Sequence, residues 1–331
     1  MLRVLACIPH YFRRNAEDSG VINGSNTDTP ASRSIQMGYC LRNLVAILES
    51  SQFILGSPNT LAMESVRQTS KTVSGSVILV TVPENNLLDL ISTNTVVDHE
   101  FSEGSPRELG YHCRRTFARF VGQYDYYLFI EDDTALLDPR FFQKVAAFHA
   151  AFGEGKIVQP NRFELVGRMD GAWRAYLDMP AFPQHRSPER EGPATLALPS
   201  YGGDVIFEKT TDAISGCYVI SDSQLRQWMT QPHFDHPDPK AIAAGHDPLE
   251  LTQIALGGTL PIYRPLGQDM NFLEVHHVPN RLSNAKTPKT AIRDIVMPLV
   301  DARVAARTGR QAQGSIAPGD QASPSLDNHP R

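Results

Sequence analysis

Residues 124–133 read Tyr-Asp-Tyr-Tyr-Leu-Phe-Ile-Glu-Asp-Asp, an apolar run followed at once by three acids. The aromatic and aliphatic residues 126–130 are typical of a strand buried on both faces, as in a parallel sheet. Glu131, Asp132 and Asp133 repel one another and resist desolvation, so folding alone does not explain them there. A bound Mg²⁺ or Mn²⁺ would explain the three acids, because these ions bind carboxylate oxygens together with substrate phosphates. The alternative is a solvated acidic turn without function.

A helix is expected directly after the acids. Asp138 suits the N-cap of a helix, and Pro139 suits its first position. Apolar residues continue the helix at Phe141, Phe142 and Val145. The acids therefore lie in the loop at the carboxyl end of a strand, which is where open α/β sheets bind ligands.

Composition and charge exclude several classes of protein. The chain has 331 residues, enough for one large or two small domains, and its 41% hydrophobic and 20% charged residues are ordinary for a globular protein. The formal net charge of -5 gives no support to a general nucleic-acid or anionic-membrane binder. We therefore expect no nucleic-acid partner.

Cysteine spacing and hydropathy indicate the compartment. The four cysteines are far apart and form no CxxC pair, so neither a zinc site nor a disulfide framework is indicated. Buried thiols suit a reducing compartment, and without a run of about 18 apolar residues no transmembrane segment is expected. Residues 1–8 are too short for a signal peptide and run directly into strand-like sequence. We expect a cytoplasmic protein, either soluble or peripherally attached to the membrane.

The remaining periodicity predicts alternating strands and helices. Strands are expected at residues 2–8, 76–82, 156–160, 212–221, 259–264 and 273–278, and helices at 34–49, 87–91, 107–121, 221–229 and 291–307. The strand–helix–strand order at the start implies a parallel pair joined by a right-handed crossover. The polar stretch 13–32 and the proline-rich stretch 180–203 are interpreted as loops, the second lying over a binding site.

Three arginines and a histidine- and aspartate-rich segment could bind phosphate or metal, but each also has a simpler explanation. Three arginines, Arg114, Arg115 and Arg119, come shortly before the predicted strand 126–130. One of them could bind a diphosphate, although solvated arginines on a helix face are the alternative. Residues 233–238 read His-Phe-Asp-His-Pro-Asp, but their prolines and irregular spacing favour a surface loop over a metal site.

Two late segments carry further candidates. Asp247, Pro248 and Glu250 fit the N-cap, first and third positions of a helix, a complete structural explanation, yet a carboxylate at a helix start could also serve as a general base. His276 and His277 are adjacent in a predicted strand, which sends them to opposite faces. At most one of them is therefore expected to face a given site, where an imidazole is a good ligand for Mn²⁺-type ions.

The order of these features resembles that of GT-A-type glycosyltransferases over about residues 2–285. Those enzymes carry a DxD motif at the end of a strand, and here Glu131 replaces its first Asp. The resemblance implies a GT-A-like, Rossmann-type α/β fold with an open mixed sheet flanked by helices in one large domain. It would comprise a nucleotide-sugar-binding half (1–145), an acceptor-binding and catalytic half (146–285), a C-terminal helix (286–310) and a disordered tail (311–331).

The resemblance also assigns roles to residues. Asp133 would bind the metal together with His276 or His277, and Asp247 would be the catalytic base of an "xED" position where His246 replaces Glu. Glu131 would face the ribose or the metal. The remaining donor contacts are expected from Pro9, His10, Tyr11, Arg115 and Asp132, and the acceptor contacts from Gly216 and Glu250.

The implied reaction is a Mn²⁺- or Mg²⁺-dependent transfer of a hexose from a UDP- or GDP-sugar to a hydroxyl of a saccharide or other acceptor, as in polysaccharide biosynthesis. With Asp247 as base the anomeric centre would invert, and a retaining reaction is the fallback. One alternative is nucleotidyl transfer on a related sheet, for which the glycine-rich basic loop after the first strand is missing. The other is a non-catalytic module that binds a sugar or a protein.

Overall fold

The computed structural model describes residues 1–13, 29–48, 53–55, 66–68, 72–91, 97–168, 171–177, 186–200, 202–213, 215–243, 246 and 248–279. All of them belong to one compact unit, Met1–Asn280. The expected C-terminal helix and tail lie outside the described residues, as do Asp247 and the side chain of Glu250.

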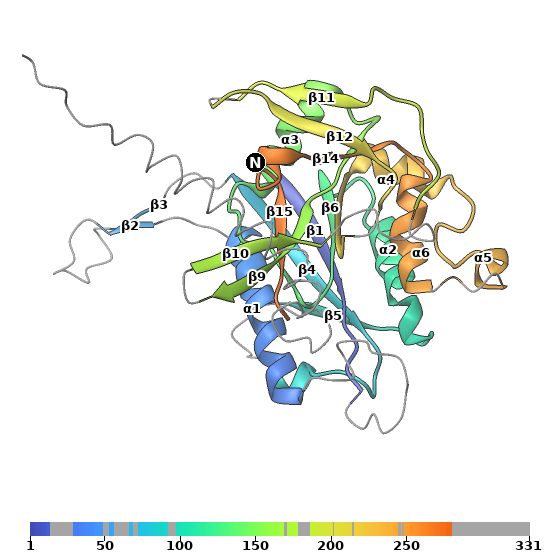
Figure 1. The fold of residues 1–331 in the computed structure, drawn as a ribbon. Helices are drawn as coiled ribbons and strands as arrows, with labels where there is room; N and C mark the ends of the chain where they lie inside the picture. The colour runs from blue at the N-terminus through green and yellow to red at the C-terminus, as the bar shows by residue number, and fades with distance from the viewer. Residues whose placement is uncertain are drawn as a thin grey trace, which may run out of the picture. The chain divides into compact units, whose positions relative to one another are not determined.

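A five-stranded sheet forms the centre of this unit (Figure 1). Its strand order is β13-β6-β1-β4-β5, in which β6, β1, β4 and β5 run parallel and β13 runs antiparallel to β6. The strands are β1 (Leu2–Pro9), β4 (Val73–Thr81), β5 (Asp98–Phe101), β6 (Tyr126–Ile130) and β13 (Cys217–Ser221). This arrangement confirms the expected open mixed sheet of an α/β protein.

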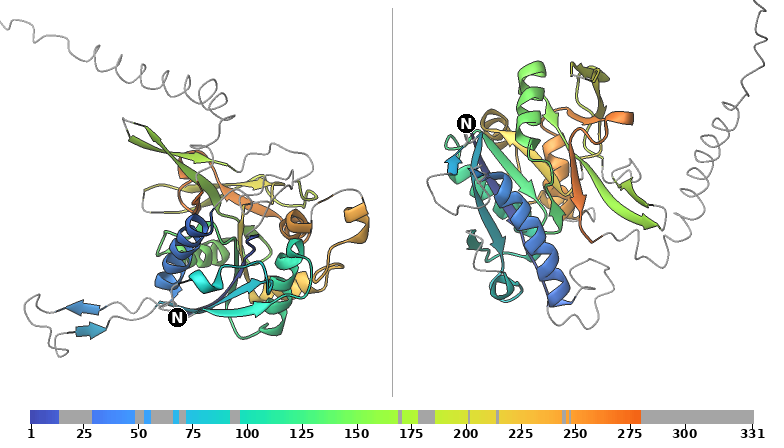
Figure 2. Two further views of the ribbon diagram at one scale, coloured as in Figure 1. Left: turned by 90° about the horizontal axis from the view of Figure 1, so that it is seen from below. Right: turned by 90° about the vertical axis from the view of Figure 1, so that its left-hand side faces the viewer.

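Helices cover both faces of the central sheet, so each inner strand contains a run of buried apolar residues. Alternate β1 residues point to opposite faces: Val4 packs in one buried cluster and Leu5 in the other. The first cluster includes α1 (Pro30–Leu48) and α3 (Phe141–Phe152), and the second includes α2 (Leu109–Arg119), α4 (Asp222–Met229) and α6 (Pro248–Gly257). Figures 1 and 2 show α1 and α2 on opposite sides of the strands. All residues of β6 are buried, as its composition predicts.

The other strands form three further sheets. One sheet has the order β10-β9-β15-β7, a second β11-β12-β14-β8, and a third pairs β2 with β3. Their bounds are β2 (Phe53–Leu55), β3 (Val66–Gln68), β7 (Thr134–Ala135), β8 (Ile157–Val158), β9 (Asn161–Arg168), β10 (Gly171–Tyr176), β11 (Thr195–Leu198), β12 (Val205–Thr210), β14 (Ile262–Pro265) and β15 (Glu274–His277). The remaining helical segments are α5 (Pro239–Ala243) and the 3₁₀ turns Leu88–Leu90, Pro106–Glu108 and Gly267–Asp269. In the described part of the chain, no helix combines the length and the apolar character that crossing a membrane requires.

The structure corrects several local expectations. Strands β5, β9, β10, β11 and β12 are not predicted from the sequence, because their polar, partly exposed residues lack a strong apolar period. Strand β11 lies within the stretch 180–203, for which the sequence predicts a loop. Helix α3 begins at Phe141 rather than after Asp138, because the Asp138 carboxylate accepts from Arg140 N (2.8 Å) and caps a turn instead. Helix α4 lies where the sequence predicts it, and Ser221 caps it in a capping box with Gln224.

Arg114 is not a solvated arginine on a helix face. Its guanidinium is fully buried, lies 4.5 Å from the Tyr111 ring centroid and 4.3 Å from that of Trp228, and donates to the carbonyls of Phe234 (3.0 Å) and Leu251 (3.3 Å). It therefore joins α2 to α4, α6 and the loop after α4.

We predict that Arg114→Met lowers the free energy of unfolding by about 3 kcal/mol, because Met fills the space but leaves buried carbonyls without their charged donor. Arg119→Met is the matched control on the same helix, where the half-exposed guanidinium pairs with Glu100 and its loss costs less than about 1 kcal/mol. Urea unfolding of both variants checks the difference. Equal losses would show that Arg114 does not join the helices in this way.

Candidate functional site

The three acids lie at the point where the strand order of the central sheet reverses. From β1 the chain adds β4 and β5 on one side and then returns to place β6 on the other side. The crevice at the carboxyl ends of two such strands is the usual ligand site of an open α/β sheet. His10 follows β1, and Glu131 to Asp133 follow β6, so this crevice is lined by candidate residues from two separate segments.

Asp132 is held by the protein itself. Leu87 N donates to His10 Nε2 (3.0 Å), so the ring proton of His10 lies on Nδ1, which donates to Asp132 Oδ2 at 2.5 Å. The other oxygen of Asp132 accepts from Arg33 Nη2. All three side chains are buried. Asp132 therefore ties together the ends of β1 and β6 and the first turn of α1.

Asp133 is approached by a guanidinium and an imidazole at one oxygen. Its Oδ2 accepts from Arg33 Nη1 at 3.1 Å and lies 3.6 Å from His277 Nε2. The backbone brings His277 there, because β15 pairs with β7 directly after the acids, with His277 opposite Thr134, and Val278 N donates to Asp133 O (2.9 Å).

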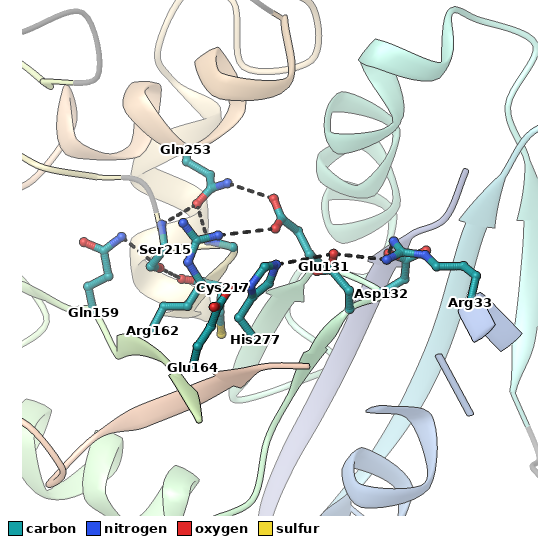
Figure 3. Close-up of polar contacts among 12 residues, drawn as sticks. Arg33, Glu131, Asp132, Gln159, Arg162, Glu164, Ser215, Cys217, Gln253 and His277 are labelled. Atoms are coloured by element: carbon teal, nitrogen blue, oxygen red, sulfur yellow. Dashed lines mark hydrogen bonds and ion pairs between the residues drawn. The ribbon is translucent and has the colours of Figure 1, made fainter. Parts of the chain in front are cut away.

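His277 is fixed from its other side by Glu164. The Nδ1 of His277 lies 2.6 Å from Glu164 Oε1, and both side chains are buried (Figure 3). Burial lowers the pKa of His277, but hydrogen bonds to Asp133 and Glu164 outweigh burial and raise its pKa above the ordinary value. His276 points to the opposite face, where its ring stacks on Phe163 at 5.1 Å between centroids. Of the two candidate histidines, His277 faces the acids.

Glu131 lies between β9 and α6. Its Oε2 is 3.8 Å from Arg162 Nη1, and its Oε1 accepts from Gln253 Nε2 at 3.5 Å (Figure 3). Burial raises the pKa of Glu131 and repulsion by Asp133 raises it further, while Arg162 and His277 offset part of the rise. Its side chain keeps 24% of its surface accessible, more than those of Asp132 and Asp133.

Gln253 and Gly216 set the position of Glu131. Gln253 Oε1 accepts from the backbone N–H groups of Ser215 (2.9 Å) and Gly216 (3.0 Å), which ties α6 to the start of β13. Gly216 has φ +65, and a Cβ there would lie 2.7 Å from Glu131 Oε2. The glycine therefore leaves the space that the carboxylate occupies.

The structure brings together most, but not all, of the candidates from the sequence. His10, Glu131, Asp132, Asp133, Gly216 and His277 meet in the crevice, and Pro9 ends the strand that leads to it. Tyr11 packs against the apolar cluster that contains α2. Arg115 instead donates to the carbonyl of Asp235 (2.7 Å). The roles of Asp247 and Glu250 stay predictions.

Four further residues of the site were missed by sequence reasoning: Arg33, Arg162, Glu164 and Gln253. Arg33 could have been found from the sequence, because it lies one turn before Met37 on the apolar, core-facing side of α1. An arginine on an apolar stripe is rarely buried without a partner. The other three residues stand out only once their strands and helix are placed.

The divalent cation that the family resemblance implies would need an open site here. In the part of the chain that is described, no three His, Cys, Asp or Glu side chains are grouped to hold a metal ion. Asp133 Oδ2 and His277 Nε2 nevertheless face each other at 3.6 Å, with Glu164 on the far nitrogen. Mg²⁺ or Mn²⁺ can use few protein ligands and complete its shell with water and phosphate oxygens. The residues fit such an open site and not a closed structural one.

Comparisons with known proteins give no family assignment. No family model matches the chain, and no curated protein matches it. Among solved structures, a mannose-1-phosphate geranyltransferase from Thermus thermophilus is similar at TM-score 0.35 and 13% identity, over 84% of this chain and 76% of that one. HddC from Yersinia pseudotuberculosis is similar at TM-score 0.32 and 10% identity, over 82% and 97%. A 4-diphosphocytidyl-2C-methyl-D-erythritol synthase is similar at TM-score 0.32 and 13% identity, over 82% and 97%. Similarities this weak support no conclusion about function.

We predict that Gly216→Ala destabilises the protein more than Gly267→Ala. Both glycines have nearly the same left-handed φ, +65 and +64, so each variant loses roughly 1–2 kcal/mol of backbone free energy. Only the Cβ at position 216 meets another group, the Glu131 carboxylate, whereas nothing lies within 4 Å at position 267. Overpacking should add about 1–3 kcal/mol at position 216, measured by urea unfolding. Equal losses would mean that Glu131 moves away without cost.

Proposed function

We propose that this chain is a divalent-cation-dependent transferase that moves a sugar from a nucleoside diphosphate donor to a hydroxyl group of an acceptor. One observation carries the proposal: His277 Nε2 and Asp133 Oδ2 face each other at 3.6 Å at the reversal point of the sheet. Folding alone gives no reason to gather two buried acids, a partly buried acid and a buried imidazole at that crevice. An anionic ligand that arrives with a cation gives one.

The donor would be bound through its diphosphate. Asp133 and His277 would hold Mn²⁺ or Mg²⁺, which when bound neutralises the leaving diphosphate. Arg33 lies on the same oxygen of Asp133 and adds a positive charge beside the place proposed for the diphosphate. Glu131, which is still accessible, is the carboxylate left to accept a hydrogen bond from a hydroxyl of the donor. His10 and Arg33 keep Asp132 in place while the donor binds.

The acceptor side would be supplied by the start of α6. Helix α6 begins at Pro248, and Gln253 within it contacts Glu131. At a rise of about 1.5 Å per residue, the first turn of α6 lies within roughly 8 Å of Gln253 along the helix axis. Asp247 would take the proton of the acceptor hydroxyl as that oxygen attacks the anomeric carbon and the diphosphate leaves, with inversion. If no carboxylate reaches the acceptor, retention is expected instead.

We predict a cation-dependent thermal shift with one class of nucleotide. UDP, GDP, CMP and dTDP, each with and without Mn²⁺, would be screened against the wild type and Asp133→Asn. A ligand present at 100 times its Kd adds about 2.7 kcal/mol to the folded state, which is a shift of several degrees. The shift should require Mn²⁺ and disappear in Asp133→Asn.

Asp125→Asn is the matched control, because Asp125 precedes the same strand at its opposite end and pairs with Arg3 near the surface. It should shift like the wild type. A shift of equal size with and without Mn²⁺ would count against a cation site. A larger shift with a nucleoside triphosphate, added as a further ligand, would favour nucleotidyl transfer, and no shift with any nucleotide would favour a non-catalytic binding module.

We also predict that Asp247→Asn reduces transfer by about 10²–10⁴-fold while the Kd of the donor stays unchanged, because a general base acts in the transition state and not in donor binding. Isothermal titration and a transfer assay, both with the sugar nucleotides of the base found in the screen, give the two quantities. His246→Gln, one residue earlier, is the control and should keep its activity. An Asp247→Asn enzyme with unchanged kcat would exclude Asp247 as the base.

A further inference from the structure

Glu164 is a buried carboxylate that no sequence motif singles out. It lies on β9, which runs parallel to β15 with Phe163 opposite His276. Side chains alternate between the faces of a strand, so Phe163 and His276 share one face while Glu164 and His277 share the other. The register alone therefore brings Glu164 beside His277, and the two side chains meet at 2.6 Å.

We propose that Glu164 is a positioning residue for the cation site, acting through His277; this inference rests on the proposed function. Glu164 Oε1 accepts the proton on His277 Nδ1, which leaves Nε2 as the nitrogen that faces Asp133. Histidines that bind metals commonly donate their other N–H to a carboxylate, which fixes the tautomer and the ring plane and makes the ligand nitrogen more basic. Glu164 is placed to do all three.

The proposed role also gives a reason for the burial of the Glu164 carboxylate beside His277. Glu164 is 1% exposed, and a carboxylate loses much of its hydration at such a position. A site whose ligand histidine must hold one orientation gains from a rigid acceptor on a neighbouring strand, whereas a water molecule would let the ring turn. The alternative role is a buried ion pair that only stabilises the β9–β15 pairing. That role predicts a loss of stability with no change in cation affinity.

A matched control lies on the same strand as His277. Glu274 on β15 is the acceptor for Tyr176 OH (2.9 Å) and lies 3.3 Å from Arg174 Nη2, so it also joins β15 to the β9–β10 hairpin. It does not take part in the contacts of His277, Asp133 and Arg33 described above. Glu274→Gln therefore reproduces the neutralisation of a partly buried acid on this sheet without touching the His277–Asp133 pair.

The test is a titration of the full-length protein with Mn²⁺ alone, followed by the electron paramagnetic resonance signal of the free aquo ion. Asp133→Asn serves to identify which bound Mn²⁺ belongs to the crevice. We expect Glu164→Gln, which keeps the size and one acceptor oxygen, to weaken Mn²⁺ binding by about 10–100-fold. Glu274→Gln should bind as the wild type does. Urea unfolding without metal records any loss of stability separately.

The outcomes separate this inference from the proposed function. If Glu164→Gln binds Mn²⁺ as tightly as the wild type, Glu164 is only a structural partner, and the proposed cation site stands. If the wild type shows no Mn²⁺ binding that depends on Asp133, the proposed cation site fails and the positioning role fails with it. Should Glu164→Gln not fold, Glu164→Asp gives the same reading: the charge stays but the shorter side chain no longer reaches Nδ1, so weaker binding supports the role and unchanged binding overturns it.

Discussion

The burial of Asp132 and Asp133, next to a partly buried Glu131, is the constraint on which the arrangement of this site depends. Carboxylates that leave water need donors or cations close by, and side chains that follow one another in sequence point in different directions. Each acid therefore has a partner of its own, although Asp132 and Asp133 share Arg33. Glu131 is met by Arg162 from β9 and Gln253 from α6, Asp132 by His10 and Arg33, and Asp133 by Arg33 and His277. The acids thereby fix how α1, α6, β9 and β15 meet the end of β6.

The central sheet could be predicted from the sequence because its strands are long apolar runs and its helices carry regular apolar stripes. The segments that form β1, β4, β6 and β15 are predicted within a few residues, and so is helix α4. The order of the strands in the sheet, however, cannot be predicted from the local pattern of apolar residues. That β6 returns to the other side of β1, and so places His10 against Asp132, follows from long-range pairing between segments more than a hundred residues apart.

The partners of the acids were hidden for the same reason. Arg162 and Glu164 lie in β9, whose mixture of polar and apolar residues gives no clear period. Only the pairing of β9 with β15 places these two residues at the site. Arg115 shows the opposite error. Its position just before the central strand suggested a phosphate contact, but the rotation of α2 turns its guanidinium toward the loop after α4. Sequence distance from a motif is a poor guide to distance in space.

The residues that depart from local sequence preferences lie together in one crevice. An arginine sits on the core-facing side of α1, a glutamate lies inside a strand, a glycine adopts a left-handed conformation against a carboxylate, and three acids end a buried strand. Each of these costs stability by itself, and selection for folding alone would replace or scatter them. Arg33, Glu164, Gly216 and the acids are instead linked through shared contacts with His277, Asp133 and Glu131. The ligand proposed above, at the carboxyl ends of β1 and β6, would give these four departures one common reason.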